Sequence, residues 1–341
     1  MESLPDMLPV TGRAQERMPT DVEAAIPDVL VAPLPDAGTR ANHTLVRHER
    51  FDYLLSLMAR CQERSKLSDE PKCMALEGVT GAGKSTLVRR YARDYPPYAT
   101  AGGMCIPVFR VETPSPVSPR GMASAMLEAL QDPYYDRGTG SILQTRLAKL
   151  LKACAVELVI LDDFHHLIDA DTDRVLQTVS DWLKVLLKET HIPFVVIGMP
   201  NSLKRIFNAN AQLARLFPIR EHLGTLQGLT ELHAFLNAFE AETQAQIAPE
   251  HDRTDLLQRL AYATDGVVGF YSNLLRESIG EAAAARAPVV QMKHLHQGFA
   301  FSLAAVREGI SNPFDVHRFP VPFVAPMKQK SGHKRKQAGA A

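Results

Sequence analysis

The stretch that decides the fold of this 341-residue chain is Gly78-Val79-Thr80-Gly81-Ala82-Gly83-Lys84-Ser85. It matches the phosphate-loop pattern G-x-x-x-x-G-K-[ST] at every fixed position. The glycines permit turns that bring backbone N–H groups against phosphate oxygens, and Lys84 adds a positive charge for the β- and γ-phosphates. The Ser85 hydroxyl is a ligand for Mg²⁺, and the helix that continues through Thr86 aims its N-terminal dipole at the same anion. The stretch therefore predicts a site for a nucleoside triphosphate and Mg²⁺.

The residues around the loop favour this interpretation over a chance glycine turn. The short apolar run 73–77 before the loop is typical of a buried strand, and residues 86–91 after it can form a helix that ends before Pro96. Strand, glycine loop and helix in this order are the context that the motif requires.

Composition sets limits on the class of protein. Hydrophobic residues make up 45% and charged residues 22% of the chain, as in ordinary globular proteins, and the formal net charge is zero. A surface for nucleic acid must therefore be local. No secretory signal or membrane-spanning run is recognisable. The cysteines lie in apolar surroundings without CxxC spacing, so we expect a reduced, cytoplasmic protein; they are Cys61, Cys73, Cys105 and Cys154.

A second chemical landmark is the run Val156–Asp163, in which β-branched and leucine residues end in two acids. This pattern is typical of a buried parallel strand whose carboxyl end presents Asp162 to a metal ion and Asp163 to the attacking water. The alternative is that the two acids cap the next helix. The phosphate loop earlier in the chain favours the metal role. His165 and His166 are read as packing groups, since no third ligand at metal spacing accompanies them.

Strands and helices alternate from residue 73 to about 225. Further strands are expected at 104–111, at 193–198 and after Pro218, and Pro107 predicts an edge position for the first of these. Helices are expected at 121–131, from residue 141 and around 175–186. This alternation predicts an α/β fold with a doubly wound parallel sheet of five strands. After the 193–198 strand, Asn201 is a candidate sensor of the γ-phosphate, although Asn201 or Ser202 could equally cap a helix.

The chain divides into four parts by pattern. Residues 1–40 are rich in proline and acid and predict an extended or disordered arm, which is either a tail that docks a partner or a solvated leader. Residues 41–228 are expected to form the α/β domain, with a helix around Phe51–Cys61 before the first strand. Residues 229–310 predict a helical lid. The tail 311–341 is basic, which suits either contact with a phosphate backbone or simple solvation.

Together these motifs resemble the AAA+ ATPases, and within them the transposition regulators of the TniB and TnsC type. The features that carry the resemblance are the phosphate loop, the Asp-Asp-Phe-His-His-Leu run at 162–167, Gly-Met-Pro at 198–200, Arg-Leu-Phe-Pro at 215–218 and the helical lid. The resemblance implies a homo-oligomer that binds ATP between subunits and forms rings or helical filaments on double-stranded DNA. It also implies partners: a transposase and a target-selector protein of the TniQ or TnsD type, which in some elements works with a CRISPR effector complex.

The resemblance also implies roles for individual residues. Lys84, Ser85 and Asp162 match phosphate and Mg²⁺ binding. Asp163 stands where the family usually has Glu, one methylene longer, so we expect slow hydrolysis. Arg215 or Arg220 matches the arginine finger that a neighbouring subunit supplies.

The resemblance also directs attention to two further features, the sensor arginine of the lid and the residues that contact DNA. Phe270 occupies the position where the lid's sensor arginine is expected, and Arg276 is a possible substitute. For DNA contact, the 112–120 loop with Arg120, and also Lys149 and Lys152, are candidates, with surface solubility as the competing account.

Other functions fit the same motifs. One is an AAA+ initiator or helicase loader, and another is a nucleotide-dependent signalling switch that hydrolyses slowly, which Asp163 would favour. A guanine-nucleotide switch is disfavoured because the base-reading motif Asn-Lys-x-Asp is absent. A small-molecule kinase fits the Asp-Asp strand end and the long helical lid poorly.

Overall fold

The computed structural model describes residues 34–67, 70–114, 118–164, 166 and 173–315. Several predictions therefore lie outside the described residues: most of the arm, the basic tail from residue 316, the middle of the 112–120 loop and the role of His165.

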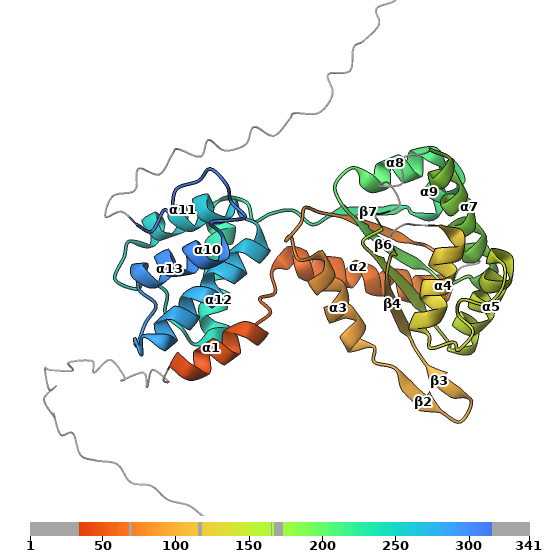
Figure 1. Cartoon of the computed structure of the whole chain (residues 1–341), viewed down its shortest axis with the longest axis horizontal. Coiled ribbons are helices and arrows are strands. Elements are labelled where there is room, and N and C mark those ends of the chain that lie inside the picture. The colour runs from red at the N-terminus through yellow and green to blue at the C-terminus, as the bar shows by residue number, and fades with distance from the viewer. Residues whose placement is uncertain (1–33, 68–69, 115–117, 165, 167–172, 316–341) are drawn as a thin grey trace, which may run out of the picture. The chain divides into compact units, whose positions relative to one another are not determined.

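A five-stranded parallel sheet forms the centre of the α/β domain (Figure 1). The strands are β1 (Met74–Glu77), β4 (Val108–Glu112), β5 (Leu158–Asp162), β6 (Phe194–Gly198) and β7 (Ile219–His222). Their spatial order is β4-β5-β6-β1-β7, and every pairing is parallel. The predicted five-stranded parallel sheet is therefore confirmed.

Pro107 has a larger effect than the sequence suggested. Residues 104–111 were expected to form one strand, but they divide at the proline, which cannot donate a ladder hydrogen bond. Before it, β3 (Gly103–Cys105) pairs antiparallel with β2 (Tyr98–Thr100) in a separate hairpin. After it, β4 lies at the edge of the main sheet, as predicted.

Helices cover both faces of the sheet. On β5, Val159 and Leu161 point into one core and Leu158 and Ile160 into the other, because successive side chains of a strand alternate between faces. The first core is closed by α4 (Pro119–Ala129), α5 (Gly140–Ala153), α7 (Asp173–Thr190), α8 (Ser202–Ala209) and α9 (Ala211–Leu216). The second is closed by α2 (Glu49–Ser65) and α3 (Lys84–Asp94). This arrangement is the doubly wound architecture that the sequence predicts.

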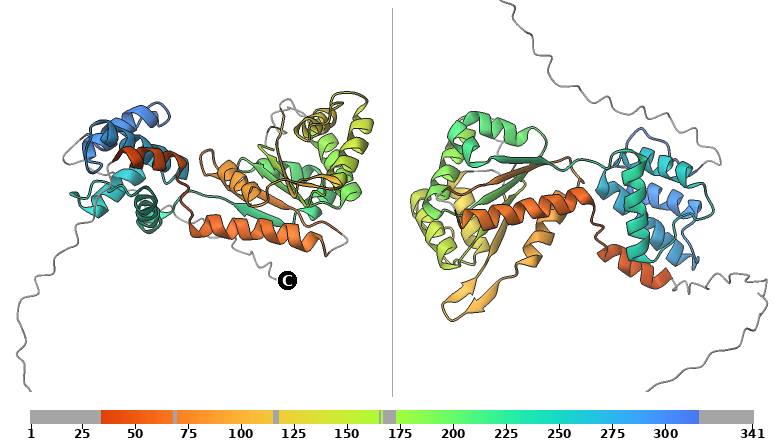
Figure 2. Two further views of the ribbon diagram at one scale, coloured as in Figure 1. Left: turned by 90° about the horizontal axis from the view of Figure 1, so that it is seen from below. Right: turned by 180° about the vertical axis from the view of Figure 1, so that it is seen from behind.

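A separate core, built only from helices, is formed mainly by residues that follow the sheet in the sequence. It is built by α10 (Gly228–Thr243), α11 (Arg253–Thr264), α12 (Val268–Ala284) and α13 (Met292–Ser302). Helix α1 (Leu34–His43) joins them and packs beside α12, with Ala37 and Ala41 buried (Figures 1 and 2). Residues 34–40 were expected to belong to an extended arm; they are instead helical, because α1 buries its small apolar residues against the lid. Within the described residues, no helix has both the length and the apolar character needed to cross a bilayer.

Candidate functional site

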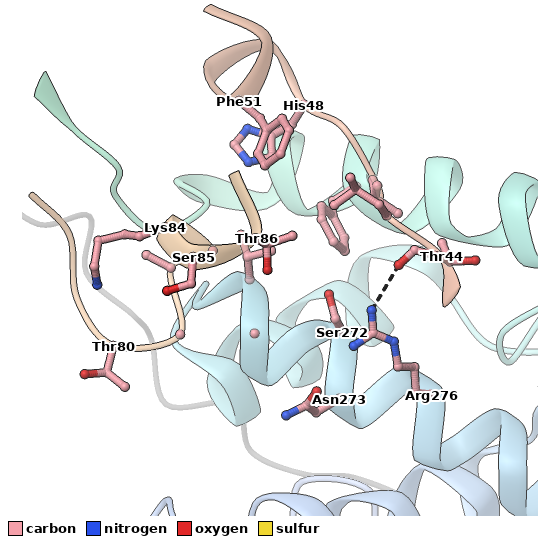
Figure 3. A pocket seen from close by; sticks show the side chains of 18 of the residues that line it. Thr44, His48, Phe51, Thr80, Lys84, Ser85, Thr86, Ser272, Asn273 and Arg276 are labelled. Carbon is pink, nitrogen blue, oxygen red and sulfur yellow. Dashed lines mark hydrogen bonds between the residues drawn. The ribbon is translucent and has the colours of Figure 1, made fainter. Parts of the chain in front are cut away.

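The predicted phosphate loop lines a cavity of about 500 Å³ (Figure 3). The wall opposite the loop is contributed by α12, and one end of the cavity is closed by the segment from Thr44 to Phe51. The remaining lining comes from residues that follow β5 and β6 and from Phe235 of α10. The cavity thus has phosphate-binding chemistry at one side and apolar groups, including Val46 and Phe51, at another.

The loop has the backbone geometry that anion binding requires. Gly81 and Gly83 have φ angles of 80° and 98°, in the left-handed region that side chains disfavour. Gly83 is also the N-cap of α3, and among the residues that the structure describes no side-chain cap accepts the first N–H groups of that helix. These donors are therefore open to a phosphate. The third glycine acts differently: a Cβ atom on Gly78 would lie 2.5 Å from the carbonyl oxygen of Leu223, so packing against the chain after β7 excludes it.

Lys84 is buried beneath the loop. Its Nζ donates to the carbonyl oxygens of Gly78 at 2.7 Å and Val79 at 3.0 Å. Burial lowers the pKa of Lys84, and the charges of Asp163 and Asp162 oppose this shift. The lysine is thus a cation held by weak neutral acceptors beside two acids, and it can exchange those carbonyls for phosphate oxygens.

Asp162 ends β5 with a carboxylate that is only 1% exposed. Its Oδ1 accepts a hydrogen bond from the Ser85 hydroxyl at 3.4 Å and another from the N–H of Asp163 at 3.1 Å. The structure therefore brings together the two predicted Mg²⁺ ligands. Within the described residues, no group of three His, Cys, Asp or Glu side chains could hold a metal. Mg²⁺ needs no such group when substrate phosphates supply the other oxygens.

Asp163 lines the cavity beside Lys84, and its role toward the attacking water stays a prediction. Its φ angle of 54° lies in the left-handed region. Among residues with side chains, Asp and Asn adopt this conformation most readily. The backbone here therefore offers a local reason for Asp in place of the longer Glu.

Arg110, for which the sequence predicted no role, is a third partner of Asp162, after the Ser85 hydroxyl and the N–H of Asp163. Its Nη2 donates to Asp162 Oδ2 at 2.9 Å, across the β4–β5 pairing. No motif surrounds Arg110. Its proximity depends on β4 lying next to β5, and the only available signal was its position two residues before the end of an edge strand.

Asn201 does not line the cavity. It is exposed at the N-cap of α8, with a left-handed φ of 65°, and its N–H donates to the Glu77 carboxylate at 3.3 Å. The residue that reaches the cavity from the end of β6 is Met199, whose sulfur accepts a hydrogen bond from Thr80 Oγ1 at 3.6 Å. Asn201 occupies the N-cap position of α8, but its side chain makes no cap hydrogen bond there within the described residues. The sensor role of Asn201 stays a prediction.

The two candidate finger arginines differ in how they are held. Arg215 has a side chain that is 73% exposed, and within the described residues it pairs with Glu70, which is 65% exposed, at 2.9 Å. Arg220 donates to the carbonyl oxygens of Phe217 at 3.1 Å and Ala214 at 2.9 Å, and its guanidinium stacks on the Phe207 ring. Arg215 is thus held loosely at the surface, whereas Arg220 is engaged by backbone carbonyls and an aromatic ring of its own chain.

Helix α12 meets the phosphate loop directly. The N–H of Gly269 donates to the carbonyl oxygen of Gly81 at 2.8 Å, and a Cβ atom on Gly269 would lie 2.8 Å from the same oxygen. Phe270, the residue at the expected sensor position, packs against the helical core instead. The approach of α12 to the loop therefore depends on a glycine.

Arg276 lines the cavity from α12, but two of its donors are engaged by backbone carbonyls in the last turn of α1 and just after it. Nε donates to the carbonyl oxygen of Ala41 at 2.8 Å. Nη2 donates to the carbonyl oxygen of Thr44 at 3.0 Å, as Figure 3 shows. Burial lowers the pKa of its guanidinium. Arg276 thus holds the segment that closes the apolar end of the cavity, where burial also lowers the pKa of His48.

The candidate DNA-binding residues lie on α4 and α5, away from the cavity lining. Arg120 is exposed but donates to the carbonyl oxygens of Asp136 at 2.8 Å and Gly138 at 3.4 Å. Lys149 and Lys152 are exposed on α5. The two lysines are therefore open to a polyanion, while Arg120 also closes the turn between the helices. DNA contact by these residues stays a prediction.

Comparison with known proteins agrees with this geometry. Residues 39–223 match the model of a family described as bacterial TniB protein. The ORC1 protein of Aeropyrum pernix in complex with DNA has a similar structure, with a TM-score of 0.55 and 18% identity over 75% of this chain and 65% of that one. Cdc6p from Pyrobaculum aerophilum gives a TM-score of 0.58 at 15% identity over 80% and 72% of the chains.

A further similar structure is Drosophila ORC bound to DNA, with a TM-score of 0.50 at 15% identity over 86% and 71% of the chains. This chain spans 65% of the length of the ORC1 protein. At such identities the likeness concerns the fold. No protein of curated function matches the sequence.

Proposed function

The chain belongs to the TniB family and has the fold of an AAA+ ATPase, and from these two facts we propose that it is an ATP-dependent regulator of DNA transposition. In this role it binds ATP and Mg²⁺, assembles on double-stranded DNA as a ring or helical filament, and links a target-selector protein to the transposase. The proposal combines the family with the chemistry of the cavity.

The observation that carries the proposal is the hydrogen bond between Ser85 and Asp162, 77 residues apart, at 3.4 Å. A hydroxyl and a buried carboxylate beside a phosphate loop are oxygen ligands of the kind that Mg²⁺ takes. When bound there, Mg²⁺ would offset the negative charge of the phosphates. The residues present therefore fit the group.

This chain's own residues divide the remaining work. The uncapped N–H groups at the start of α3 and the Lys84 ammonium bind the phosphates. Asp163 orients the attacking water and accepts its proton, and the exposed Arg215 reaches the γ-phosphate of an adjacent subunit. Because the cavity becomes complete only when a second copy supplies that arginine, nucleotide binding and assembly are coupled.

The test compares the wild type with Lys84→Ala by mobility shift and negative-stain imaging on duplex DNA, with ATP, with a slowly hydrolysed analogue and without nucleotide. The wild type should form rings or filaments only with nucleotide and DNA, and Lys84→Ala should form none. Lys188→Ala, an exposed lysine on α7, is the matched control and should behave as the wild type. If Lys84→Ala coats DNA normally, or if the wild type stays monomeric throughout, the proposal is wrong.

A second candidate is a nucleotide-dependent switch that binds partners and barely hydrolyses ATP. The observation in its favour is Asp163, with its short side chain and left-handed backbone. The imaging test separates the two, since a switch of this kind needs no assembly on DNA. The likeness to initiator proteins concerns the fold and does not favour an initiator role.

A further inference from the structure

The ion pair between Arg110 and Asp162 lies beside the proposed Mg²⁺ site and is explained by none of the roles assigned so far. Arg110 is on the edge strand β4, and its side chain is 24% exposed. Its Nη2 donates to Asp162 Oδ2 at 2.9 Å and to the exposed Glu112 at 3.1 Å. Its Nε is buried and makes no hydrogen bond among the described residues. The guanidinium is therefore committed chiefly to Asp162.

The two oxygens of Asp162 have different partners. Oδ1 faces the Ser85 hydroxyl and the N–H of Asp163, and Oδ2 faces Arg110. A buried carboxylate requires both a compensating charge and filled hydrogen bonds. Ser85 and the N–H are neutral, so the guanidinium supplies the charge without covering the oxygen that faces the phosphate loop.

We propose that Arg110 is a positioning residue that serves as the counter-charge of Asp162 whenever the site holds no nucleotide, so that Mg²⁺ binds only together with the triphosphate. This inference rests on the proposed function and extends it by stating that the metal ion does not bind before the triphosphate. With Arg110 in place, a divalent cation alone would meet a carboxylate that is already neutralised. The triphosphate brings further negative charge and oxygen ligands, and then the metal can bind alongside the arginine.

The structure also explains why a guanidinium suits this role. It is planar and always charged, so it can hold Oδ2 in the plane of the carboxylate and leave Oδ1 aimed at Ser85. Lys84, the other nearby cation, is bound to the carbonyl oxygens of Gly78 and Val79 and donates no hydrogen bond to Asp162 in the described contacts.

The experiment measures Mn²⁺ binding to the full chain without nucleotide, by the loss of the free-ion signal in electron paramagnetic resonance. Arg110→Met removes the charge and keeps the aliphatic length, Arg110→Lys keeps the charge, and Arg90→Met removes an arginine that pairs with Asp94 on the surface of α3. Arg110→Met should bind Mn²⁺ at least about tenfold more tightly than the wild type. The reason is that the interaction energy of two unit charges a few ångströms apart exceeds the free energy to which a tenfold change in affinity corresponds. Arg110→Lys and Arg90→Met should behave as the wild type.

Thermal unfolding gives an independent reading. Mg²⁺ alone should raise the melting temperature of Arg110→Met and leave that of the wild type unchanged. If Arg110→Met does not fold, the double variant Arg110→Met/Asp162→Asn removes both charges and should recover a folded protein. The proposal is overturned if Arg110→Met binds Mn²⁺ no better than the wild type, or if the double variant is no more stable than Arg110→Met.

Failure of this inference is distinguishable from failure of the proposed function. Binding of a fluorescent ATP analogue to the wild type in the presence of Mg²⁺ tests the nucleotide site itself. If the wild type binds the analogue and Arg110→Met shows no gain in Mn²⁺ affinity, only the role of Arg110 is wrong. If the wild type does not bind the analogue, the proposed function is wrong.

Discussion

Replacing Arg276 by methionine separates two roles that this residue could have. In the structure its guanidinium holds the last turn of α1 and the backbone that follows it, through the carbonyl oxygens of Ala41 and Thr44 at 2.8 and 3.0 Å. A lid sensor would instead contact the γ-phosphate. Methionine keeps the apolar stem and removes both hydrogen bonds, so the effect isolates the guanidinium.

The expected magnitude follows from these two contacts. A hydrogen bond from a charged donor contributes about 1.5–3 kcal/mol, and the lower end applies to a half-buried group, so Arg276→Met should lower the free energy of unfolding by about 2–4 kcal/mol. Arg276→Lys should recover part of this loss, because an ammonium can reach one carbonyl but lacks the planar fork. The loosened segment lines the cavity, so the dissociation constants for ATP and ADP should both rise roughly tenfold, which corresponds to about 1.4 kcal/mol.

The assays are urea unfolding of the nucleotide-free chain and titration with fluorescent ATP and ADP analogues. Arg307→Met is a matched control, since Arg307 also donates to two backbone carbonyls, those of Ala263 and Tyr262, at 3.2 Å each, without lining the cavity. It should lose comparable stability while nucleotide affinity stays unchanged. If Arg276→Met unfolds as the wild type does and loses affinity for ATP but not for ADP, the arginine serves the γ-phosphate and the reasoning is refuted.

The remaining predictions concern hydrolysis. Asp163→Glu should raise the turnover number about tenfold or more. Misplacement by roughly 1 Å costs a catalytic group about a hundredfold in rate, but the left-handed backbone at this position disfavours Glu and cancels part of the gain. Steady-state phosphate release measures this, and equal rates for wild type, Asp163→Glu and Asp163→Ala would contradict it. Arg215→Ala should leave the free energy of unfolding within about 1 kcal/mol of wild type while lowering turnover on DNA by about a thousandfold. Arg220→Ala should lose about 2 kcal/mol of stability through its two carbonyl contacts; loss of turnover with unchanged stability in that variant would reverse the assignment.

The chemistry of the phosphate side could be predicted from the sequence because its determinants are local. The spacing of the loop places glycines, lysine and serine at the start of one helix whatever surrounds them. The run before Asp162 has the apolar character of a strand buried on both faces, and parallel strands end at a common edge. Helical periodicity likewise anticipated α7 and the lid helices.

The contacts around that chemistry depend on the tertiary structure. Periodicity shows that a face is buried but not which element covers it, so the packing of α1 beside α12 and the bonds of Arg276 to residues more than 230 positions away were not predictable. The partner of Asp162 depends on strand order and register: β4 lies next to β5 with Glu112 opposite Asp162, which brings Arg110 within reach. The sequence by itself therefore determined which groups can bind a triphosphate. The pairing of distant segments decided which charges surround them, because register and packing arise only when the chain has folded.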